Sequence, residues 1–289
     1  MNVTVLAKQI PDVEGHLEID RASRVVSSQN IIVNPLDMSA LEEAVRIREQ
    51  LQNSSATVIS LGTVKAVKAL RDCLSGGADE AVHVHDPAFD RRDSHATGRI
   101  LAKAIALQPY DIILCGQRSA DTQAGVTGAL VAEQLGIPLV TDVVKIELKP
   151  DASDLVLTRK LEAGKREVLE VSAPIVISVG SGINEPRYPS LRAIKDAKKK
   201  LIKTYDLKAL GYTDEGTDIY GSMTRVVEIS SARPALQRLF IPDSTFPAAT
   251  RVYLLMGGGI SEKKTKMIAG SPEEIASQFV DLFTERRII

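Results

Sequence analysis

Short apolar segments alternate with helix-period segments through residues 3–135, and this alternation is the strongest constraint on the fold. The spacing predicts strands at 3–7, 56–61, 81–84 and 111–115, and helices at 39–51, 64–74, 94–107 and 126–135. Such an order is typical of a parallel sheet covered by helices on both faces. Ile112, Ile113 and Leu114 form an unbroken apolar run, as expected for a strand buried on both sides. The sequence therefore predicts an α/β protein with a doubly wound parallel sheet.

The pattern changes after Gly136. Strands are expected at 141–148, 155–161, 167–172 and 174–179 without helices between them, which predicts an antiparallel extension of the sheet. A loop containing Pro186 and Pro189 follows, and then a short basic helix over 192–200. We expect the core to span residues 1–203.

Residues 204–289 are predicted to form a C-terminal arm. Weak periodicity with several glycines and prolines indicates irregular structure over 204–250. Ser271 at the N-cap and Pro272 in the first turn predict a last helix that runs to Thr284. Its apolar side chains share one face and fit an arm that packs on a partner: Ile275, Phe279, Leu282 and Phe283.

The helix at 39–51 carries two local signals. Ser39 and Glu42 match a capping box, which predicts that the helix begins there. Its apolar stripe comprises Leu41, Ala44, Val45, Arg48 and Leu51, and the positions mostly off the stripe are Glu42, Glu43, Arg46 and Glu49.

Composition excludes several classes of protein. The 36 Lys and Arg nearly balance the 37 Asp and Glu, which argues against a nucleic-acid binder, and the lack of Trp argues against a base-stacking surface. No apolar run reaches the roughly 18–20 residues needed to span a bilayer. The first residues read as a strand and not as a signal peptide, so a cytoplasmic protein is expected.

Cysteine and histidine give no clear metal or catalytic signal. Cys73 and Cys115 are the only cysteines and lack C-x-x-C spacing, which excludes a disulfide framework and a cysteine zinc site. His83 and His85 share a strand face, where polar edge-strand residues are favoured over metal ligands. No catalytic residue and no metal site are predicted.

Ligands of open parallel sheets bind beyond the carboxyl ends of the strands. Lys8–Asp12, Asn34–Asp37 and Gly116–Gly128 are expected there. The last segment joins a small-residue loop to a helix N-terminus, whose free N–H groups favour a phosphate. It is neither a P-loop nor a G-x-G-x-x-G fingerprint. A plain connecting loop, whose polar side chains only cap the helix, remains the alternative.

The loop before the basic helix presents apolar and aromatic groups on a stiff turn: Pro186, Tyr188, Pro189 and Leu191. Exposed groups of this kind indicate docking of a partner. Packing of the loop on its own sheet fits the pattern equally well.

Taken in order, several blocks resemble the small (beta) subunit of electron transfer flavoproteins over residues 1–203. The matching blocks are Ala7–Asp12, Asn34–Asp37, Ala40–Ala44, Leu70–Asp79, Gly116–Gly128, Gly136–Pro138 and Asn184–Leu191 with its lysine tail. The resemblance implies an electron carrier and not a catalyst of bond chemistry. It also implies a heterodimer with a larger alpha subunit that holds FAD, and AMP or a second FAD in this subunit.

The resemblance also assigns residues. Nucleotide contacts carried over by position are Leu6, Asn34, Pro35, Leu36, Asp37, Leu61, Gly116, Gln117, Arg118, Ser119, Asp121, Thr122, Gln123, Ala124, Gly125, Val126 and Thr127, with the phosphate at the last three. The residues expected to dock an acyl-CoA dehydrogenase or similar redox protein are Asn184, Glu185, Pro186, Arg187, Tyr188 and Leu191. Leu191 would be the apolar anchor.

Two of these blocks resemble different types of electron transfer flavoprotein. Lys8–Asp12 is more similar to electron-bifurcating members, whereas Gly125–Gly128 lacks the glutamine that those members usually carry. AMP and FAD therefore both stay open. A stand-alone adenine-nucleotide-binding module of universal-stress-protein type, on the same flavodoxin-like sheet, is the alternative; it would be a homodimer that binds ATP without flavin.

Overall fold

The structure, a computed structural model, describes residues 1–15, 17–20, 25–28, 30–89, 92–149, 154–212, 222–224, 227, 241–256 and 269–285. The chain divides into two compact units, Met1–Ser231 and Ala232–Ile289. The boundary expected after residue 203 stays a prediction.

Within the described residues of the first unit, the main sheet has nine strands in the order β11-β10-β9-β12-β8-β1-β6-β7-β13. Their bounds are β1 Asn2–Leu6, β6 Ser55–Leu61, β7 Glu80–Val84, β8 Ile112–Gly116, β9 Leu139–Leu148, β10 Asp154–Lys160, β11 Arg166–Ser172, β12 Ile175–Val179 and β13 Ile202–Tyr205. All neighbouring pairs from β9 to β13 in that order are parallel. The predicted α/β class with a parallel sheet is confirmed.

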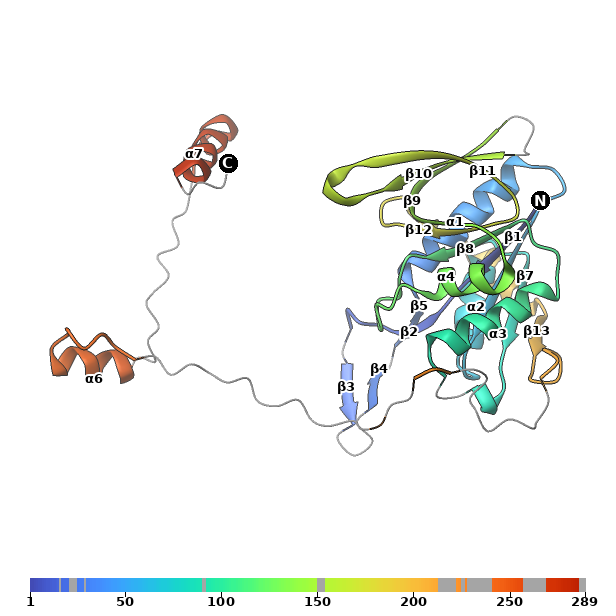
Figure 1. Cartoon of the computed structure of the whole chain (residues 1–289), viewed down its shortest axis with the longest axis horizontal. Helices are drawn as coiled ribbons and strands as arrows, with labels where there is room; N and C mark the ends of the chain where they lie inside the picture. The colour runs from blue at the N-terminus through green and yellow to red at the C-terminus, as the bar shows by residue number, and fades with distance from the viewer. Residues whose placement is uncertain are drawn as a thin grey trace. The chain divides into compact units, whose positions relative to one another are not determined.

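Helices cover both faces of this sheet (Figure 1). On one face α1 (Pro35–Gln50), α2 (Ala66–Ser75) and α5 (Leu191–Lys199) share a hydrophobic core cluster with Val3 and Val5 of β1. On the other face α3 (Ser94–Ala106) and α4 (Thr127–Leu135) share a second core cluster with Leu6 and Ile59. The central strands are therefore buried on both sides, which explains their largely apolar sequences.

The predicted antiparallel extension is confirmed for β9, β10 and β11 but wrong for the last strand. Strand β12 lies parallel between β8 and β9, and all of its residues are buried. Its largely apolar sequence, broken only by the buried Ser178, is the pattern of a central parallel strand, and burial on both faces decides its place in the sheet.

Strand β13 was not predicted. After α5 the chain pairs Ile202–Tyr205 in parallel with β7. Strand β7 is therefore not an edge strand, and His83 is buried. The His83 and His85 rings stack at 5.2 Å, and both contact the carbonyl oxygen of Gly62.

The predicted start of the 39–51 helix is wrong, because α1 begins at Pro35. Proline at the first helical position has the backbone angle that a helix needs and lacks an N–H that would stay unbonded. Ser39 lies inside the helix, where its hydroxyl donates to the carbonyl of Pro35 at 3.5 Å. Glu42, the other half of the expected capping box, is buried and binds a distant arginine, described below.

The remaining elements of the first unit are short. They comprise the antiparallel pairs β2 (Gln9–Pro11) with β5 (Ile31–Val33) and β3 (Leu17–Asp20) with β4 (Val25–Ser28), and the 3-10 turns η1 (Pro87–Phe89) and η2 (Glu162–Gly164).

In the second unit the structure describes α6 (Ala248–Met256), which was not predicted, and α7 (Pro272–Glu285). Helix α7 starts as predicted: the Ser271 hydroxyl accepts from the Glu274 N–H at 3.3 Å, and Glu274 accepts from the Ser271 N–H at 2.8 Å. Much of the stretch expected to be irregular lies outside the described residues. Among the described helices, none has the length and apolar character needed to cross a bilayer.

Candidate functional site

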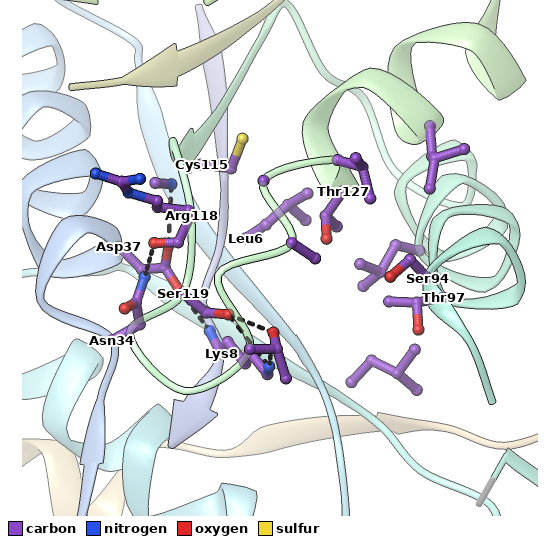
Figure 2. A pocket seen from close by; sticks show the side chains of 18 of the residues that line it. Leu6, Lys8, Asn34, Asp37, Ser94, Thr97, Cys115, Arg118, Ser119 and Thr127 are labelled. Atoms are coloured by element: carbon purple, nitrogen blue, oxygen red, sulfur yellow. Dashed lines mark hydrogen bonds between the residues drawn. The ribbon is translucent and has the colours of Figure 1, made fainter. Parts of the chain in front are cut away.

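The sheet order creates a crevice beside β1. From β1 the chain continues to β6 on one side, whereas β8 lies on the other side, so the loops that leave β1 and β8 diverge. Ligands of open α/β sheets bind at such a switch point. A cavity of about 810 Å³ opens there, at the carboxyl ends of β1, β6 and β8 (Figure 2). This volume lies within the roughly 300–1,000 Å³ of ordinary ligand pockets.

Most residues predicted to contact a nucleotide line this cavity. They are Leu6, Asn34, Asp37, Leu61, Gly116, Gln117, Arg118, Ser119, Thr122, Ala124, Gly125, Val126 and Thr127. Pro35, Leu36, Asp121 and Gln123 are not among the lining residues. The structure thus brings three distant segments of the sequence to one cavity.

Two further parts of the cavity wall were not predicted from the sequence. One is the start of α3, with Asp93, Ser94 and Thr97, and the other contains Met223 and Thr224. In Figure 2, Ser94 and Thr97 lie across the space from Asn34 and Asp37. Because α3 follows the carboxyl end of β7, its position after a strand was an available signal, whereas nothing in the sequence indicated residues 223 and 224.

Asn34 and Asp37 hold the loop that follows β8. The Asn34 amide donates to the carbonyl of Arg118 and accepts from the Ala120 N–H, both at 3.1 Å. The two oxygens of Asp37 accept from the N–H groups of Lys8, at 2.8 Å, and Gly116, at 2.9 Å. These polar atoms bind protein backbone, so both residues shape the cavity by fixing its loops.

Burial raises the pKa of Asp37 to about 6, although hydrogen bonds from Lys8, Asn34 and Gly116 act in the opposite direction. The space around the carboxylate is also tight. A β-carbon on Gly116 would lie 2.5 Å from Asp37 Oδ1 and 2.7 Å from Leu36 Cβ, so only glycine fits at the end of β8.

Lys8 fastens the outer part of the same loop. Its ammonium lies 2.8 Å from Asp121 Oδ1, 3.3 Å from the Ser119 hydroxyl and 3.2 Å from the Thr122 hydroxyl. Burial alone would raise the pKa of Asp121, but the hydrogen bonds and charge of Lys8 leave it below its usual value. Asp121, predicted to contact the nucleotide, therefore binds Lys8.

The start of α4 remains available for an anion. Its N-cap residue, Val126, makes no side-chain cap. The preceding Gly125 adopts a φ of +66°, which turns the chain into the helix. The first N–H groups of a helix have no partner within it and carry its positive dipole end. At the start of α3, by contrast, Asp93 already accepts from the Ala96 N–H at 2.9 Å.

The loop before α5 has an inner and an outer side. Tyr188 is 99% exposed and Leu191 70% exposed. Asn184 instead donates to the Ser39 carbonyl at 2.9 Å and to Glu43 at 2.7 Å. The loop is thus attached to α1 and still directs an aromatic and an apolar group to solvent.

Arg187 forms the main attachment. Its guanidinium donates to both oxygens of Glu42, at 2.9 and 3.1 Å, and to both oxygens of Glu49, at 2.6 and 3.0 Å. Burial by itself raises the pKa of Glu42, but the hydrogen bonds and charge of Arg187 lower it below its usual value. Glu42 and Glu43 are therefore buried although they lie off the apolar stripe, because this loop covers them.

A doubly wound parallel sheet with a cavity at its switch point defines the class of α/β proteins that hold ligands beyond their strand ends. Within that class, residues 24–210 match the family described as "Electron transfer flavoprotein domain". The chain therefore belongs to the electron transfer flavoprotein family, and its similarity to beta subunits, given next, makes it a small-subunit member. This assignment decides against a stand-alone module of universal-stress-protein type.

Relatives that are similar over most of their length agree. The electron transfer flavoprotein subunit beta of Thermoanaerobacterium thermosaccharolyticum is 40% identical over 80% of this chain and 88% of its own. That of Methylophilus methylotrophus is 33% identical over 93% of this chain and 97% of its own. The caffeyl-CoA reductase-Etf complex subunit CarD of Acetobacterium woodii is 31% identical over the full length of both chains.

Proposed function

We propose that this subunit binds an adenine nucleotide in the switch-point cavity and pairs with a larger alpha subunit that carries FAD. The uncapped N-terminus of α4, which lines the cavity at Val126 and Thr127, carries this proposal. A phosphate there would accept hydrogen bonds from the free N–H groups of the first helical turn. Neither subunit would form or break substrate bonds in this role; the pair would carry electrons between redox proteins in the cytoplasm.

AMP or a second FAD would occupy the cavity, and the number of flavins distinguishes them. The full chain is purified together with its alpha subunit and denatured. The released nucleotides are then separated, identified by mass spectrometry and quantified per heterodimer. One FAD with one AMP per heterodimer identifies an ordinary carrier. Two FAD per heterodimer identify a bifurcating member. A heterodimer that releases neither AMP nor a second FAD refutes nucleotide binding by this subunit.

The loop at 184–191 would dock an acyl-CoA dehydrogenase or a similar redox protein through Tyr188 and Leu191. Around these exposed side chains, α5 presents Arg192, Lys195, Lys198 and Lys199 to solvent, which favours an acidic partner surface. Asn184 and Arg187 would serve docking indirectly, because their side chains bind α1. A fixed loop loses less entropy when it binds.

Leu191→Ala tests the docking role. Loss of a central apolar anchor is expected to lower kcat/KM for electron exchange with the dehydrogenase about thirtyfold, since hot-spot truncations cost about 2 kcal/mol. Nucleotide content stays unchanged. Val168→Ala, on the distant edge strand β11 and 65% exposed, is the matched control. Equal kcat/KM for Leu191→Ala and the control would refute the docking role.

A further inference from the structure

We propose that Asp93 is a positioning residue that fixes the segment Ser222–Thr224, so that Met223 and Thr224 form one wall of the nucleotide cavity. The proposal rests on the proposed binding of an adenine nucleotide. It adds a segment that lies beyond residue 210, where the family match ends. Met223 and Thr224 line the same cavity as Gly125–Thr127.

The contacts of Asp93 divide between its two carboxylate oxygens. Oδ1 accepts from the Ala96 N–H and caps α3. Oδ2 accepts from the N–H of Met223 at 2.7 Å, the N–H of Thr224 at 2.9 Å and the Thr224 hydroxyl at 3.1 Å. The Asp93 N–H in turn donates to the Ser222 hydroxyl at 3.2 Å.

This division requires a carboxylate. A serine, threonine or asparagine would cap α3 with one acceptor oxygen, as at other helix starts. Only an ionised aspartate at this position offers a second oxygen for the donors of Met223 and Thr224. Although burial alone would raise it, the pKa of Asp93 is about 2, because the hydrogen bonds from Ala96, Thr224 and Met223 stabilise the charged form.

The charge also orients the ligand. A phosphate beside Asp93 would be repelled by the carboxylate, whereas the start of α4 carries no such group. The phosphate therefore belongs at α4, and an uncharged part of the nucleotide faces Met223 and Thr224. A methionine suits a ring there, since its flexible thioether packs well against aromatic edges.

Asp93→Asn is the most informative variant, tested in the full chain purified with its alpha subunit. Asparagine caps a helix as well as aspartate, so α3 is retained. Its single acceptor oxygen cannot serve both Ala96 and the 222–224 segment. Thr224→Val removes one donor from the other side of the contact. Asp86→Asn is the control, because Asp86 accepts from Ala88 and Leu207 and does not line the cavity.

AMP and FAD are titrated separately into nucleotide-stripped complex, and hydrogen exchange is followed at the amides of residues 223 and 224. For the nucleotide that wild type binds, Asp93→Asn is expected to raise Kd about tenfold and Thr224→Val about threefold, and both speed exchange at the two amides. Asp86→Asn changes neither.

Wild-type affinity in both variants, or unchanged exchange at residues 223 and 224 in Asp93→Asn, overturns the role of Asp93 and leaves nucleotide binding intact. If the wild-type complex binds neither AMP nor FAD, both the proposed function and the role of Asp93 fail.

Discussion

The N–H of Gly116 donates to Asp37 Oδ1 at 2.9 Å, which joins the end of β8 to the first turn of α1. The other oxygen of Asp37 accepts from the N–H of Lys8, which lies just after the end of β1. One buried carboxylate therefore sets the spacing of the loops that diverge at the switch point. Its ionisation links the shape of the cavity to pH.

The free energy of unfolding is expected to depend on Asp37 between about pH 4 and about pH 6. The pKa of Asp37 is about 6 in the folded chain, above the ordinary 3.8. The native state therefore binds the proton more tightly than the unfolded state, and the contribution of Asp37 to stability decreases as pH rises through this range. The expected loss is ~3 kcal/mol.

Urea unfolding of wild type and Asp37→Asn at several pH values between these limits measures this effect. The variant has no titrating group at this position, so its stability should fall less steeply with rising pH. Parallel pH profiles for the two proteins would contradict the raised pKa.

Gly116→Ala should destabilise the fold and displace the loop after β8. The new β-carbon would lie 2.5 Å from Asp37 Oδ1 and 3.0 Å from the Leu36 carbonyl carbon, where the backbone cannot easily yield. Overpacking of this kind costs about 1–3 kcal/mol. The loss of stability is measured by chemical unfolding, and nucleotide retention should fall with it.

Gly136→Ala is the matched control for this prediction. Gly136 has a φ of +66°, but nothing lies within 4 Å of its added β-carbon. Its cost is therefore backbone strain alone, about 1 kcal/mol, and the cavity stays unchanged. A nucleotide affinity as low in Gly136→Ala as in Gly116→Ala would show that general destabilisation, and not the loop, accounts for the loss.

The parallel core could be predicted because its strands are buried on both faces, so their sequences are largely apolar, as in Ile112–Leu114. Strand β13 was missed because Ile202–Tyr205 is only four residues long and has polar residues, Lys203 and Thr204, at its centre. Ser39 and Glu42 match the sequence pattern of a capping box, but α1 begins at Pro35 and the two residues lie inside it. Glu42 instead binds Arg187, which is 145 positions away in the sequence, and a pattern of neighbouring residues cannot predict such a long-range ion pair.

In the candidate site, too, contacts between residues far apart in the sequence could not be predicted. The positions of Asn34, Asp37 and Asp121 after strands predicted that they lie near a ligand. Whether such a side chain contacts ligand or protein depends on which loops meet, and that follows from the order of β8, β1 and β6 in the sheet. All three bind the protein's own loops. The sequence left open whether polar side chains of the loop cap α4, and in the structure its N-cap residue makes no side-chain cap.

Arg187→Met should lower the free energy of unfolding by about 2–3 kcal/mol, because the buried carboxylate of Glu42 loses the guanidinium and keeps Arg46 and the backbone N–H of residue 187 as partners. Arg192→Met is the control. Arg192 has a side chain that is 93% exposed and lies 3.7 Å from Asp196, so its loss should cost less than about 0.5 kcal/mol. Chemical unfolding measures both; equal costs would show that the attachment of the loop to α1 contributes little.

Cys115 should be inert to alkylation in the folded protein although it lines the cavity. It is 5% exposed, and its thiol is oriented toward the carbonyl of Ile177 at 3.9 Å. Burial, aided by the charge of Asp37, raises the pKa of Cys115 to about 12, so almost no thiolate is present near pH 8 and iodoacetamide has no nucleophile to meet.

Peptide mapping after timed alkylation checks this expectation. Cys73, which is also buried, should stay unmodified alongside Cys115 until urea unfolds the chain. Tyr188→Cys provides a reactive reference, because position 188 is fully open to solvent. Alkylation of Cys115 at a rate near that of the introduced cysteine would mean that the thiol reaches solvent through the cavity, and the close packing of Gly128 against its sulfur would then have to be wrong.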